Sequence, residues 1–127
     1  MAFDGLGAIG QIHVSVTDLD RAISFYHETL GLPLLFRVSE QPMAFLDAGG
    51  VRLYLGVPES PASRSSPLLY FRVPDIQAAY ESLSDRGVRF EGQPHVVHRS
   101  EQTELWIAFF ADPDGTTLAL MEERSMP

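Results

Sequence analysis

The sequence contains two related halves, and this internal repeat is the feature that most limits how the chain can fold. An alternating apolar run that ends in Asp occupies residues 12–19 and recurs at 69–76, and a helical pattern follows each copy. A second similarity relates residues 45–55 to 110–120. A unit of half of these 127 residues would bury too little surface to be stable alone. We therefore expect two copies of one small unit that pack together.

The first half predicts one strand, one helix and three further strands. Apolar and polar residues alternate over 11–17, which is typical of a strand with one face on a core. Asp18 stands where a helix N-cap is expected, apolar residues follow at helical spacing as far as Leu30, and Gly31 ends the helix. The strands that we expect after this helix lie at about 34–38, 43–47 and 51–56.

The second half repeats this order of elements. A strand over 69–73 precedes Asp75, the expected N-cap, and the helix that follows ends at Gly87. Candidate strands then lie at about 88–91, 94–99, 105–110 and 117–121. We interpret the acidic segment 112–115 as a tight turn rather than a calcium loop, because Asp, Pro and Gly are turn residues.

The predicted fold is a single α+β domain over residues 1–127, built from two βαβββ modules. Module one covers about 8–57, a Ser- and Pro-rich linker covers about 58–67, and module two covers about 68–123. In each module the apolar face of the sheet is expected to pack on the helix. The two modules together should form a curled mixed sheet with a central cleft.

Alternation along the strands places polar and aromatic side chains on the cleft face. In the first half these are His13, Ser15, Arg52 and Tyr54, and in the second half they are Tyr70, Arg72, Thr117, Ala119 and Met121. The aromatic members of this set, with Met121 and Trp106, are candidates for a pocket that takes a flat or hydrophobic ligand. The alternative is ordinary packing, which we favour for Trp106.

Three polar residues of this face each have two interpretations. His13 is either a ligand contact or general base, or a histidine that is bonded to a neighbour such as Tyr70 or Ser15. The guanidinium of Arg72 suits a carboxylate or phosphate of a ligand, and it also suits an internal pair with Asp or Glu, which we favour. Arg52 has the same two interpretations.

The composition excludes several function classes. Seventeen acidic residues against nine basic ones give a net charge of −8, so we expect no nucleic-acid partner, which needs a basic face. The lack of cysteine excludes disulfides and cysteine nucleophiles, and it predicts a cytoplasmic location. No apolar stretch reaches the roughly 20 residues that span a bilayer, and the start of the chain lacks the basic region of a secretory signal. We therefore expect no association with a membrane.

Over about residues 10–123 the chain resembles the vicinal-oxygen-chelate superfamily, which includes glyoxalase I, bleomycin-resistance proteins and extradiol dioxygenases. The order and spacing of several short stretches carry the resemblance: 13–22, 25–26, 30–32, 71–76, 86–88, 110–115 and 118–120. The resemblance implies the paired βαβββ fold. It leaves the function open, because the superfamily spans lyases, epimerases, dioxygenases, thiol transferases and proteins that only bind.

The resemblance also implies where a metal would lie. Metal-dependent relatives hold one divalent ion with His and Glu ligands, and the matching positions here are His13, Tyr54, Tyr70 and Ala119. Ala119 offers no donor atom, and a neutral tyrosine is a poor ligand for such an ion. His95, His98 and Glu104 are the residues that could replace the missing ligands, but we interpret them as solvated. We therefore expect no cofactor, with a divalent metal as the alternative.

Two functions of different class follow from this site. The first is a metal-free protein that binds a small anionic or aromatic molecule and forms a homodimer. Its predicted ligand-binding residues are His13, Ser15, Arg52, Tyr54, Tyr70, Arg72, Trp106, Ala119 and Met121. The alternative is a lyase, isomerase or dioxygenase of the same superfamily, with His13 as a catalytic base or as one of a non-standard set of metal ligands.

Overall fold

The computed structural model describes residues 3–38 and 40–126. The chain divides into two compact units, residues 1–65 and 66–127, and the boundary falls inside the predicted linker. The expectation that the two units together form one domain stays a prediction.

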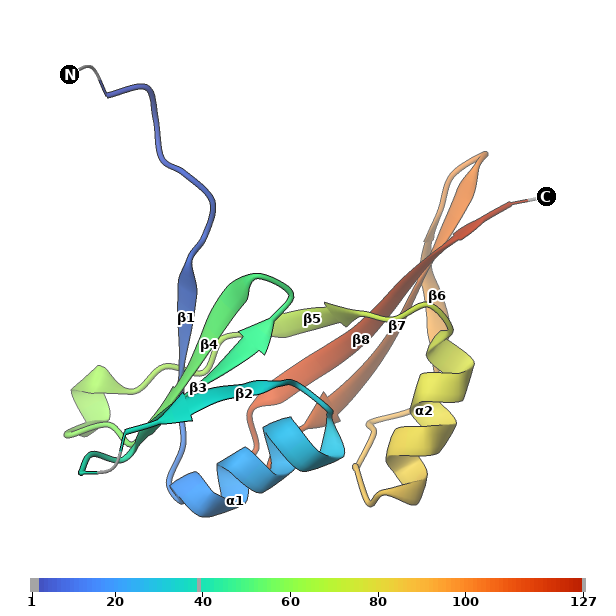
Figure 1. The fold of residues 1–127 in the computed structure, drawn as a ribbon. Coiled ribbons are helices and arrows are strands. Elements are labelled where there is room, and N and C mark those ends of the chain that lie inside the picture. The colour runs from blue at the N-terminus through green and yellow to red at the C-terminus, as the bar shows by residue number, and fades with distance from the viewer. Residues whose placement is uncertain (1–2, 39, 127) are drawn as a thin grey trace. The chain divides into compact units, whose positions relative to one another are not determined.

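The first unit is a four-stranded mixed sheet with helical turns on one face (Figure 1). Its strands lie in the order β1-β4-β3-β2, with β1 parallel to β4 and the other neighbours antiparallel. The elements are β1 (Gln11–Ser15), α1 (Leu19–Ile23), η1 (Ser24–Thr29), β2 (Leu34–Arg37), β3 (Met43–Ala48), β4 (Val51–Gly56) and η2 (Pro61–Ser63).

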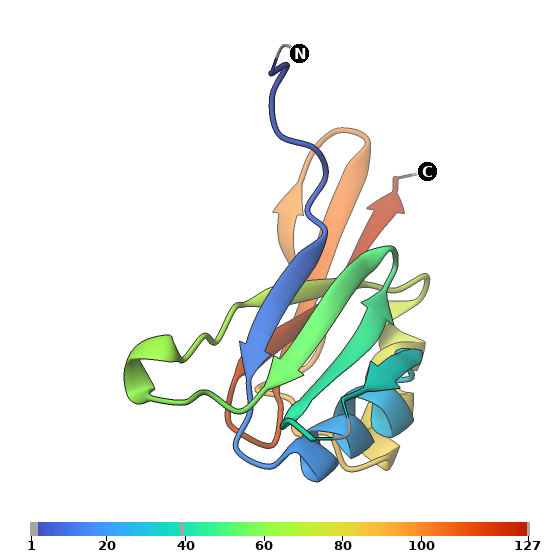
Figure 2. The same cartoon turned by 60° about the vertical axis from the view of Figure 1, so that its left-hand side comes forward.

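The second unit repeats this topology with the strand order β5-β8-β7-β6, again with one parallel and two antiparallel pairs. Its elements are β5 (Leu69–Arg72), α2 (Ile76–Asp85), β6 (His95–Arg99), β7 (Thr103–Ala111) and β8 (Thr117–Ser125). Neither sheet closes into a barrel, as the turned view in Figure 2 also shows. The predicted α+β fold of two βαβββ modules is confirmed.

Both predicted helix starts are confirmed by their caps. The Asp18 carboxylate accepts a hydrogen bond from the Arg21 backbone N–H at 3.1 Å, and α1 begins at the next residue. The Asp75 carboxylate accepts from the Ala78 N–H at 3.0 Å, and α2 begins in the same way. Each side chain satisfies a backbone donor that the first helical turn leaves without an intrahelical partner.

The first helix differs from its prediction in its second half. Residues 24–29 form π-helical turns, in which the Leu30 N–H donates to the Phe25 carbonyl five residues earlier at 2.9 Å. Tyr26 lies on this segment and is fully buried. Such a turn holds one more residue than an α-helical turn, so the α-helical spacing expected from the sequence does not describe it.

The second sheet also differs from its prediction in two places. Residues 88–91 do not form a strand, and only Phe90 makes an isolated bridge to Phe110. Gly87 at φ +93° turns the chain just before this segment, and Pro94 after it cannot donate to a ladder. Strands β7 and β8 are longer than expected, because their ladder continues from Ala111 and Thr117 to Thr103 and Ser125.

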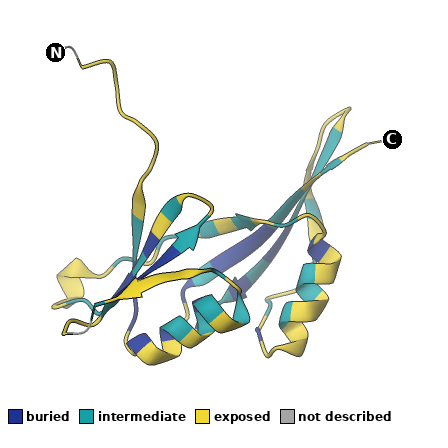
Figure 3. Cartoon of the chain, in the orientation of Figure 1, coloured by how far each residue is buried: buried dark blue, intermediate teal, exposed yellow. Residues whose placement is uncertain are grey.

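Each unit buries the apolar face of its sheet (Figure 3). Buried apolar residues of the first unit include Val14, Val16, Tyr26, Leu46, Leu53 and Leu55, and those of the second include Ile76, Ala108, Phe110, Leu118 and Leu120. The edge strand β2 is exposed along its whole length. Within the described ranges, no helix is long and apolar enough to cross a membrane.

The turns that precede β4 and β8 each use one of the two Asp residues that the repeat relates, but the connection between strands is longer in the second unit and its hydrogen bonds differ. The Asp47 carboxylate accepts from the Gly50 N–H at 2.7 Å. The Asp112 carboxylate accepts from the Asp114 and Thr116 N–H groups, both at 2.9 Å, and Gly115 has φ +83°. The tight turn expected at residues 112–115 is therefore confirmed, and Asp112 uses its carboxylate to hold the turn together.

Candidate functional site

One face of the first sheet carries a row of four rings that crosses all four strands. His13 of β1 pairs in register with Tyr54 of β4, Tyr54 with Phe45 of β3, and Phe45 with Phe36 of β2. The centroids of successive rings are 4.5, 4.8 and 4.7 Å apart. These separations are those of favourable aromatic pairs. We call these four residues the aromatic row.

The rings of the aromatic row differ in orientation and exposure. His13 meets Tyr54 edge-on at 87°, whereas Phe45 is tilted by 34° from Tyr54 and 32° from Phe36. Phe45 is buried, His13 and Tyr54 are half-buried, and Phe36 is exposed. The Arg52 guanidinium lies 5.5 Å from the centroid of the Phe45 ring. The row therefore offers partly open rings with one cation beside them.

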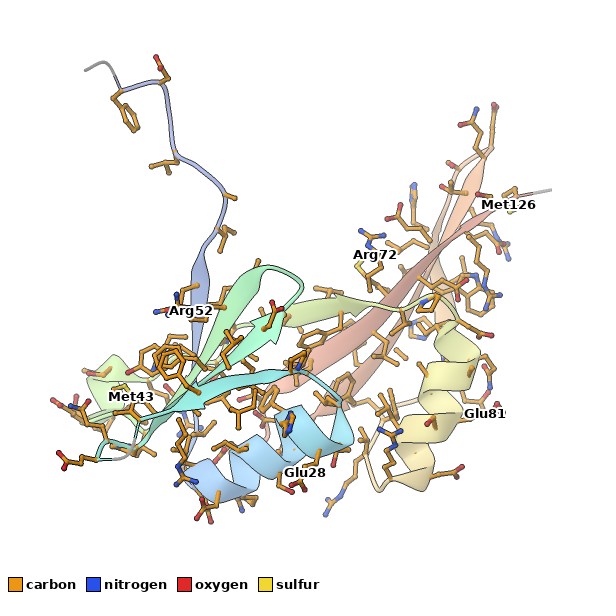
Figure 4. The ribbon with its side chains drawn as sticks, in the orientation of Figure 1. Glu28, Met43, Arg52, Arg72, Glu81 and Met126 are labelled. Carbon is orange, nitrogen blue, oxygen red and sulfur yellow. The ribbon has the colours of Figure 1, made fainter. Side chains whose placement is uncertain are left out.

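A cavity of about 370 Å³ opens beside the His13 end of the row. Its lining comes from the row, from the β2–β3 connection and from the segment after β4: His13, Gln41, Pro42, Met43, Tyr54, Val57, Pro58, Glu59 and Ser63. The Val57 N–H donates to the Pro42 carbonyl at 3.1 Å, which joins two of these segments. Met43 and Arg52, both labelled in Figure 4, come from the two central strands of this sheet. The cavity is thus formed within the first unit.

His13 is held by the linker. Its Nδ1 lies 2.6 Å from the Ser65 Oγ, and the Ser65 hydroxyl also donates to the His13 carbonyl at 2.9 Å. The Ser65 N–H donates to the Ser15 Oγ at 2.7 Å, and the Ser15 N–H donates to the Ser65 carbonyl at 2.9 Å. The neighbour that bonds His13 is therefore a linker residue, and not Tyr70 or Ser15 as the sequence suggested.

Gly56 makes room for the ring pair at the end of the row. A Cβ atom at this position would lie 2.8 Å from Tyr54 Cε1 and 3.0 Å from His13 Nε2. Both distances are below or at the limit of normal contact, so any side chain here would displace one of the two rings. No local sequence signal indicates this role, because Gly56 has no positive φ angle and ends an ordinary strand.

In the second unit the equivalent positions are filled differently. Tyr70 pairs in register with Ala119, as His13 does with Tyr54, which matches the equivalence expected from the repeat. Tyr70 is exposed and its ring meets Phe109, whose centroid is 6.2 Å away. Met121 on β8 is half-buried on the same face as Ala119. The four-ring row of the first unit is interrupted here by the small residue Ala119.

Arg72 has the internal partner that we favoured, but it is not buried. Arg72 is labelled in Figure 4. Its guanidinium donates to the Glu123 carboxylate at 2.9 Å, and its side chain is 68% exposed. An open concavity of about 410 Å³ adjoins this pair and is lined by Arg72, Val73, Pro74, Glu122 and Glu123. An exposed pair of this kind is worth little to stability.

The register of the second sheet assigns a face to Trp106. Trp106 of β7 pairs in register with Glu122 of β8, and Phe109 of β7 pairs with Ala119 of β8. Trp106 and Phe109 are three residues apart, and an odd separation along a strand places two side chains on opposite faces of the sheet. Trp106 therefore lies on the opposite face from Ala119 and Met121, which corrects the prediction that these residues line one pocket.

Trp106 belongs instead to a chain of paired polar groups. Its Nε1 donates to Glu104 at 3.2 Å, and the Arg124 guanidinium lies 4.3 Å from its ring centroid. Glu104 also accepts from Arg99 at 2.7 Å, so it is a bonded residue and not the solvated charge that we expected. The hydrogen bonds from Arg99, and then from Trp106, lower the pKa of the Glu104 carboxyl below its ordinary value.

Glu122 connects this chain of groups to the helix. One carboxylate oxygen accepts from the Ile76 N–H at 2.8 Å, at the first residue of α2, and the other accepts from Arg124 at 3.0 Å. The carboxylate thus satisfies a helix-start donor and pairs with a cation. This network fixes α2 on the second sheet.

The donor atoms present do not fit the metal site that the superfamily implies. Among residues 3–38 and 40–126, no group of three or more His, Cys, Asp or Glu side chains could hold a metal ion. The residue paired with His13 is Tyr54, and the residue paired with Tyr70 is Ala119, which has no donor. His95 and His98 are both exposed on β6, where the register shifts between Val96 and His98.

The comparisons with known proteins decide the family. A family model described as the Glyoxalase/Bleomycin resistance protein/Dioxygenase superfamily matches residues 8–120. The chain belongs to this superfamily. The match confirms the resemblance seen in the sequence, and it covers both βαβββ modules of this glyoxalase/bleomycin-resistance/dioxygenase protein.

Individual relatives agree with the superfamily. YraH, an uncharacterized protein of Bacillus subtilis (strain 168), is 32% identical over 123 residues, which cover 87% of this chain and 94% of YraH. A solved superfamily member from Sphaerobacter thermophilus DSM 20745 is 25% identical with a TM-score of 0.72, and the match covers 92% of this chain and 98% of that one.

A third similar structure is TnmS3, an antibiotic-binding protein from Streptomyces sp. CB03234. It is 24% identical with a TM-score of 0.74, and the match covers 96% of this chain and 100% of TnmS3. At this identity the likeness shows the fold alone.

Sequence reasoning found some of the site and missed the rest. It placed His13, Ser15, Arg52 and Tyr54 on one strand face, and the structure brings these together with the aromatic row. It treated residues 58–67 as a plain connector, yet Pro58, Glu59 and Ser63 line the cavity and Ser65 bonds His13. A Ser- and Pro-rich composition is the same for a segment that lines a binding site and for a simple linker, so no local sequence signal predicted a role for these residues.

Proposed function

We propose that this protein binds a flat aromatic small molecule at the aromatic row and the adjoining cavity, without a metal. The observation that carries the proposal is the continuous row of His13, Tyr54, Phe45 and Phe36 beside a cavity of about 370 Å³. Cavities that hold small ligands have volumes of about 300–1,000 Å³ and are mostly apolar with a few polar groups. The volume of this cavity lies in that range, and its lining mixes apolar residues such as Pro42, Met43 and Val57 with polar residues in about equal share.

Two further points support binding rather than metal chemistry. The donor set at the superfamily's metal positions is poor, as described above, and a divalent ion of this kind needs several nitrogen or oxygen ligands. The superfamily name includes bleomycin-resistance proteins, and the structurally similar TnmS3 is an antibiotic-binding protein. We extend binding of a small organic molecule to this chain as a proposal. Apart from Trp106, the set of ligand-binding residues predicted from the sequence stays a prediction.

The test uses 9-aminoacridine, a flat fluorescent probe, in a calorimetric and fluorescence titration. Tyr54→Ala should weaken its binding about 2- to 10-fold, because a ring pair contributes about 0.5–1.5 kcal/mol. Tyr80→Ala is the control, since Tyr80 meets Phe90 edge-on in the second unit with centroids 4.7 Å apart. Equal losses in both variants, or no binding by the wild type, would contradict the proposal.

A second candidate function is an enzyme in which His13 acts as a general base. The observation in its favour is that Ser65 occupies Nδ1, while no hydrogen bond joins His13 Nε2 to any described residue. Turnover of a superfamily-type substrate that His13→Ala abolishes would support this candidate. The metal-dependent form requires near-stoichiometric metal in elemental analysis and stabilisation by Mn, Ni, Zn, Fe or Co in a thermal-shift series.

A homodimer and a cytoplasmic location remain predictions of this proposal. Two-fold dimers are the commonest symmetric assemblies of soluble proteins, and the state of this protein is checked by light scattering at micromolar concentration. A monomer there would contradict the dimer.

A further inference from the structure

We infer that Ser65 holds His13 as the Nδ1–H tautomer, so that Nε2 accepts a hydrogen bond from an aromatic ligand that carries an N–H donor. This inference rests on the proposed function, and it names the class of ligand and a positioning residue in the linker.

The first step is the direction of the hydrogen bonds at Ser65. Its Oγ lies 2.9 Å from the His13 carbonyl oxygen and 2.6 Å from His13 Nδ1. A carbonyl only accepts, and a serine hydroxyl has one hydrogen, so that hydrogen points to the carbonyl. The Oγ must then accept from Nδ1, which therefore carries a proton. The opposite tautomer would leave two acceptor atoms facing each other at one of these contacts.

The second step is that Ser65 itself cannot turn freely. Its N–H and carbonyl both bond to Ser15, at 2.7 and 2.9 Å, and Ser15 is only 3% exposed. This pair of bonds fixes the linker backbone against the edge of β1. The hydroxyl is consequently presented to His13 in one position, and the imidazole tautomer is set by the bond that its other nitrogen makes.

The third step concerns the free nitrogen. His13 lines the cavity, its Nδ1 is used, and its Nε2 lies above Gly56 without a hydrogen-bond partner among the described residues. Nε2 is also not among the fully buried unpaired atoms of the described residues, so it is open to a ligand or to solvent. In the Nδ1–H tautomer it is an acceptor and cannot donate.

The fourth step is the charge of the lining. Of the nine residues around the cavity, Glu59 carries the only formal charge, and it is also an acceptor. At the cavity end of the row, away from the Arg52 guanidinium beside Phe45, the acceptors His13 Nε2 and Glu59 together disfavour a flat anion and favour a flat ring with N–H groups.

The experiment compares three acridines that share one ring system. The probes are 9-aminoacridine, which has N–H donors and a positive charge, 10-methylacridinium, which has the charge but no N–H, and acridine-9-carboxylate. We expect 9-aminoacridine to bind about 5- to 10-fold more tightly than 10-methylacridinium, the scale of one hydrogen bond. The carboxylate should bind most weakly. The nitrogen-15 NMR spectrum of the free protein should show a protonated Nδ1 and an unprotonated Nε2 in neutral His13.

Three variants separate positioning from folding. Ser65→Ala should mix the two His13 tautomers and so lower the preference for 9-aminoacridine over 10-methylacridinium, while Ser65→Thr restores the single tautomer and the preference. Ser60→Ala is the matched control, because Ser60 belongs to the same linker but is not among the residues that line the cavity, and its hydroxyl lies 3.4 Å from the Ser63 hydroxyl. It should leave the preference and the tautomer unchanged.

The outcomes distinguish this inference from the proposed function. Equal binding of 9-aminoacridine and 10-methylacridinium, both weakened by Tyr54→Ala, would overturn the inference and leave the proposed function intact. An Nε2–H tautomer in the wild type would also overturn it. If no acridine binds, both the proposed function and the ligand class are wrong, and the NMR comparison still decides whether Ser65 sets the tautomer.

Discussion

The two units have the same topology, but they place their small and large residues in opposite order. In the first unit the central position on β4 is Tyr54 and the end position is Gly56. In the second unit the equivalent positions on β8 are Ala119 and Met121. The first sheet therefore carries an unbroken line of rings, whereas the second brings Tyr70 only to within 6.2 Å of Phe109.

This difference teaches how one βαβββ frame can produce two distinct faces. The ladder fixes which residues lie side by side, and side-chain size at two positions decides whether rings meet. A glycine next to the ring pair lets His13 and Tyr54 approach edge-on at 4.5 Å. The cavity of the first unit is then completed by the linker, which bonds to β1 through Ser15 and His13.

The largest effect should come from removing the space that distinguishes the first unit. In Gly56→Ala the new Cβ would lie 2.8 Å from Tyr54 and 3.0 Å from His13, whose ring is held by Ser65. We expect the free energy of unfolding to fall by about 1–3 kcal/mol, as for other overpacked sites, measured by urea denaturation. Gly92→Ala in the second unit is the control, because nothing lies within 4 Å of a Cβ there. Equal stability of the two variants would show that the His13 and Tyr54 rings can move away from the new Cβ without energetic cost.

Substitution of the two N-cap residues tests whether the stability of each unit depends equally on its helix cap. Asp18→Ala and Asp75→Ala each remove one acceptor for a helix-start N–H, at 3.1 and 3.0 Å. Each should lower the free energy of unfolding by about 1 kcal/mol. The measurement is the melting temperature beside Asp18→Asn and Asp75→Asn, which retain a capping oxygen. A loss in only one unit would show that the caps are not equivalent.

A smaller difference in stability should distinguish Arg52 of the first sheet from Arg72 of the second. Arg52 lies 5.5 Å from the Phe45 ring centroid, and Arg72 pairs with the exposed Glu123. We expect Arg52→Ala to cost about 0.5–1 kcal/mol and Arg72→Ala less, because exposed ion pairs are screened. A double-mutant cycle with Phe45→Leu measures the Arg52 contribution. A larger loss for Arg72→Ala would reverse the comparison.

The smallest effect should be a pH dependence that belongs to the second unit. Hydrogen bonds from Arg99 and Trp106 lower the pKa of Glu104 below its ordinary 4.5. A carboxyl with a lowered folded-state pKa contributes stability above its unfolded-state pKa and loses it as the pH falls through the folded-state pKa. The melting-temperature difference between wild type and Glu104→Gln should therefore be full at neutral pH and shrink below about pH 4.5. A difference that grows in acid would contradict this assignment, and Glu123→Gln is the control.

The helix caps and the turn could be predicted from the sequence because the residues that form each of them lie close together along the chain. Asp18 and Asp75 cap helices through amides three residues away, and Asp112 closes a turn through amides two and four residues away. Strand alternation likewise placed His13 and Tyr54 on one face. These features need only the period of a strand or a helix and the donor and acceptor groups of single residues.

Other features depended on where the chain path brings distant residues together, which no local pattern records. Ser65 reaches His13 across 52 positions, and the linker becomes a wall of the cavity only because its backbone bonds to Ser15. The face on which Trp106 lies followed from the register of the β7–β8 ladder, which extends beyond the residues that the apolar pattern assigned to these strands. The sequence by itself thus determined the repeated βαβββ frame, the caps and the turns. The tertiary structure alone decided the ring row, its supporting glycine and the hydrogen bond that orients His13, since these require contacts between separate strands and a linker.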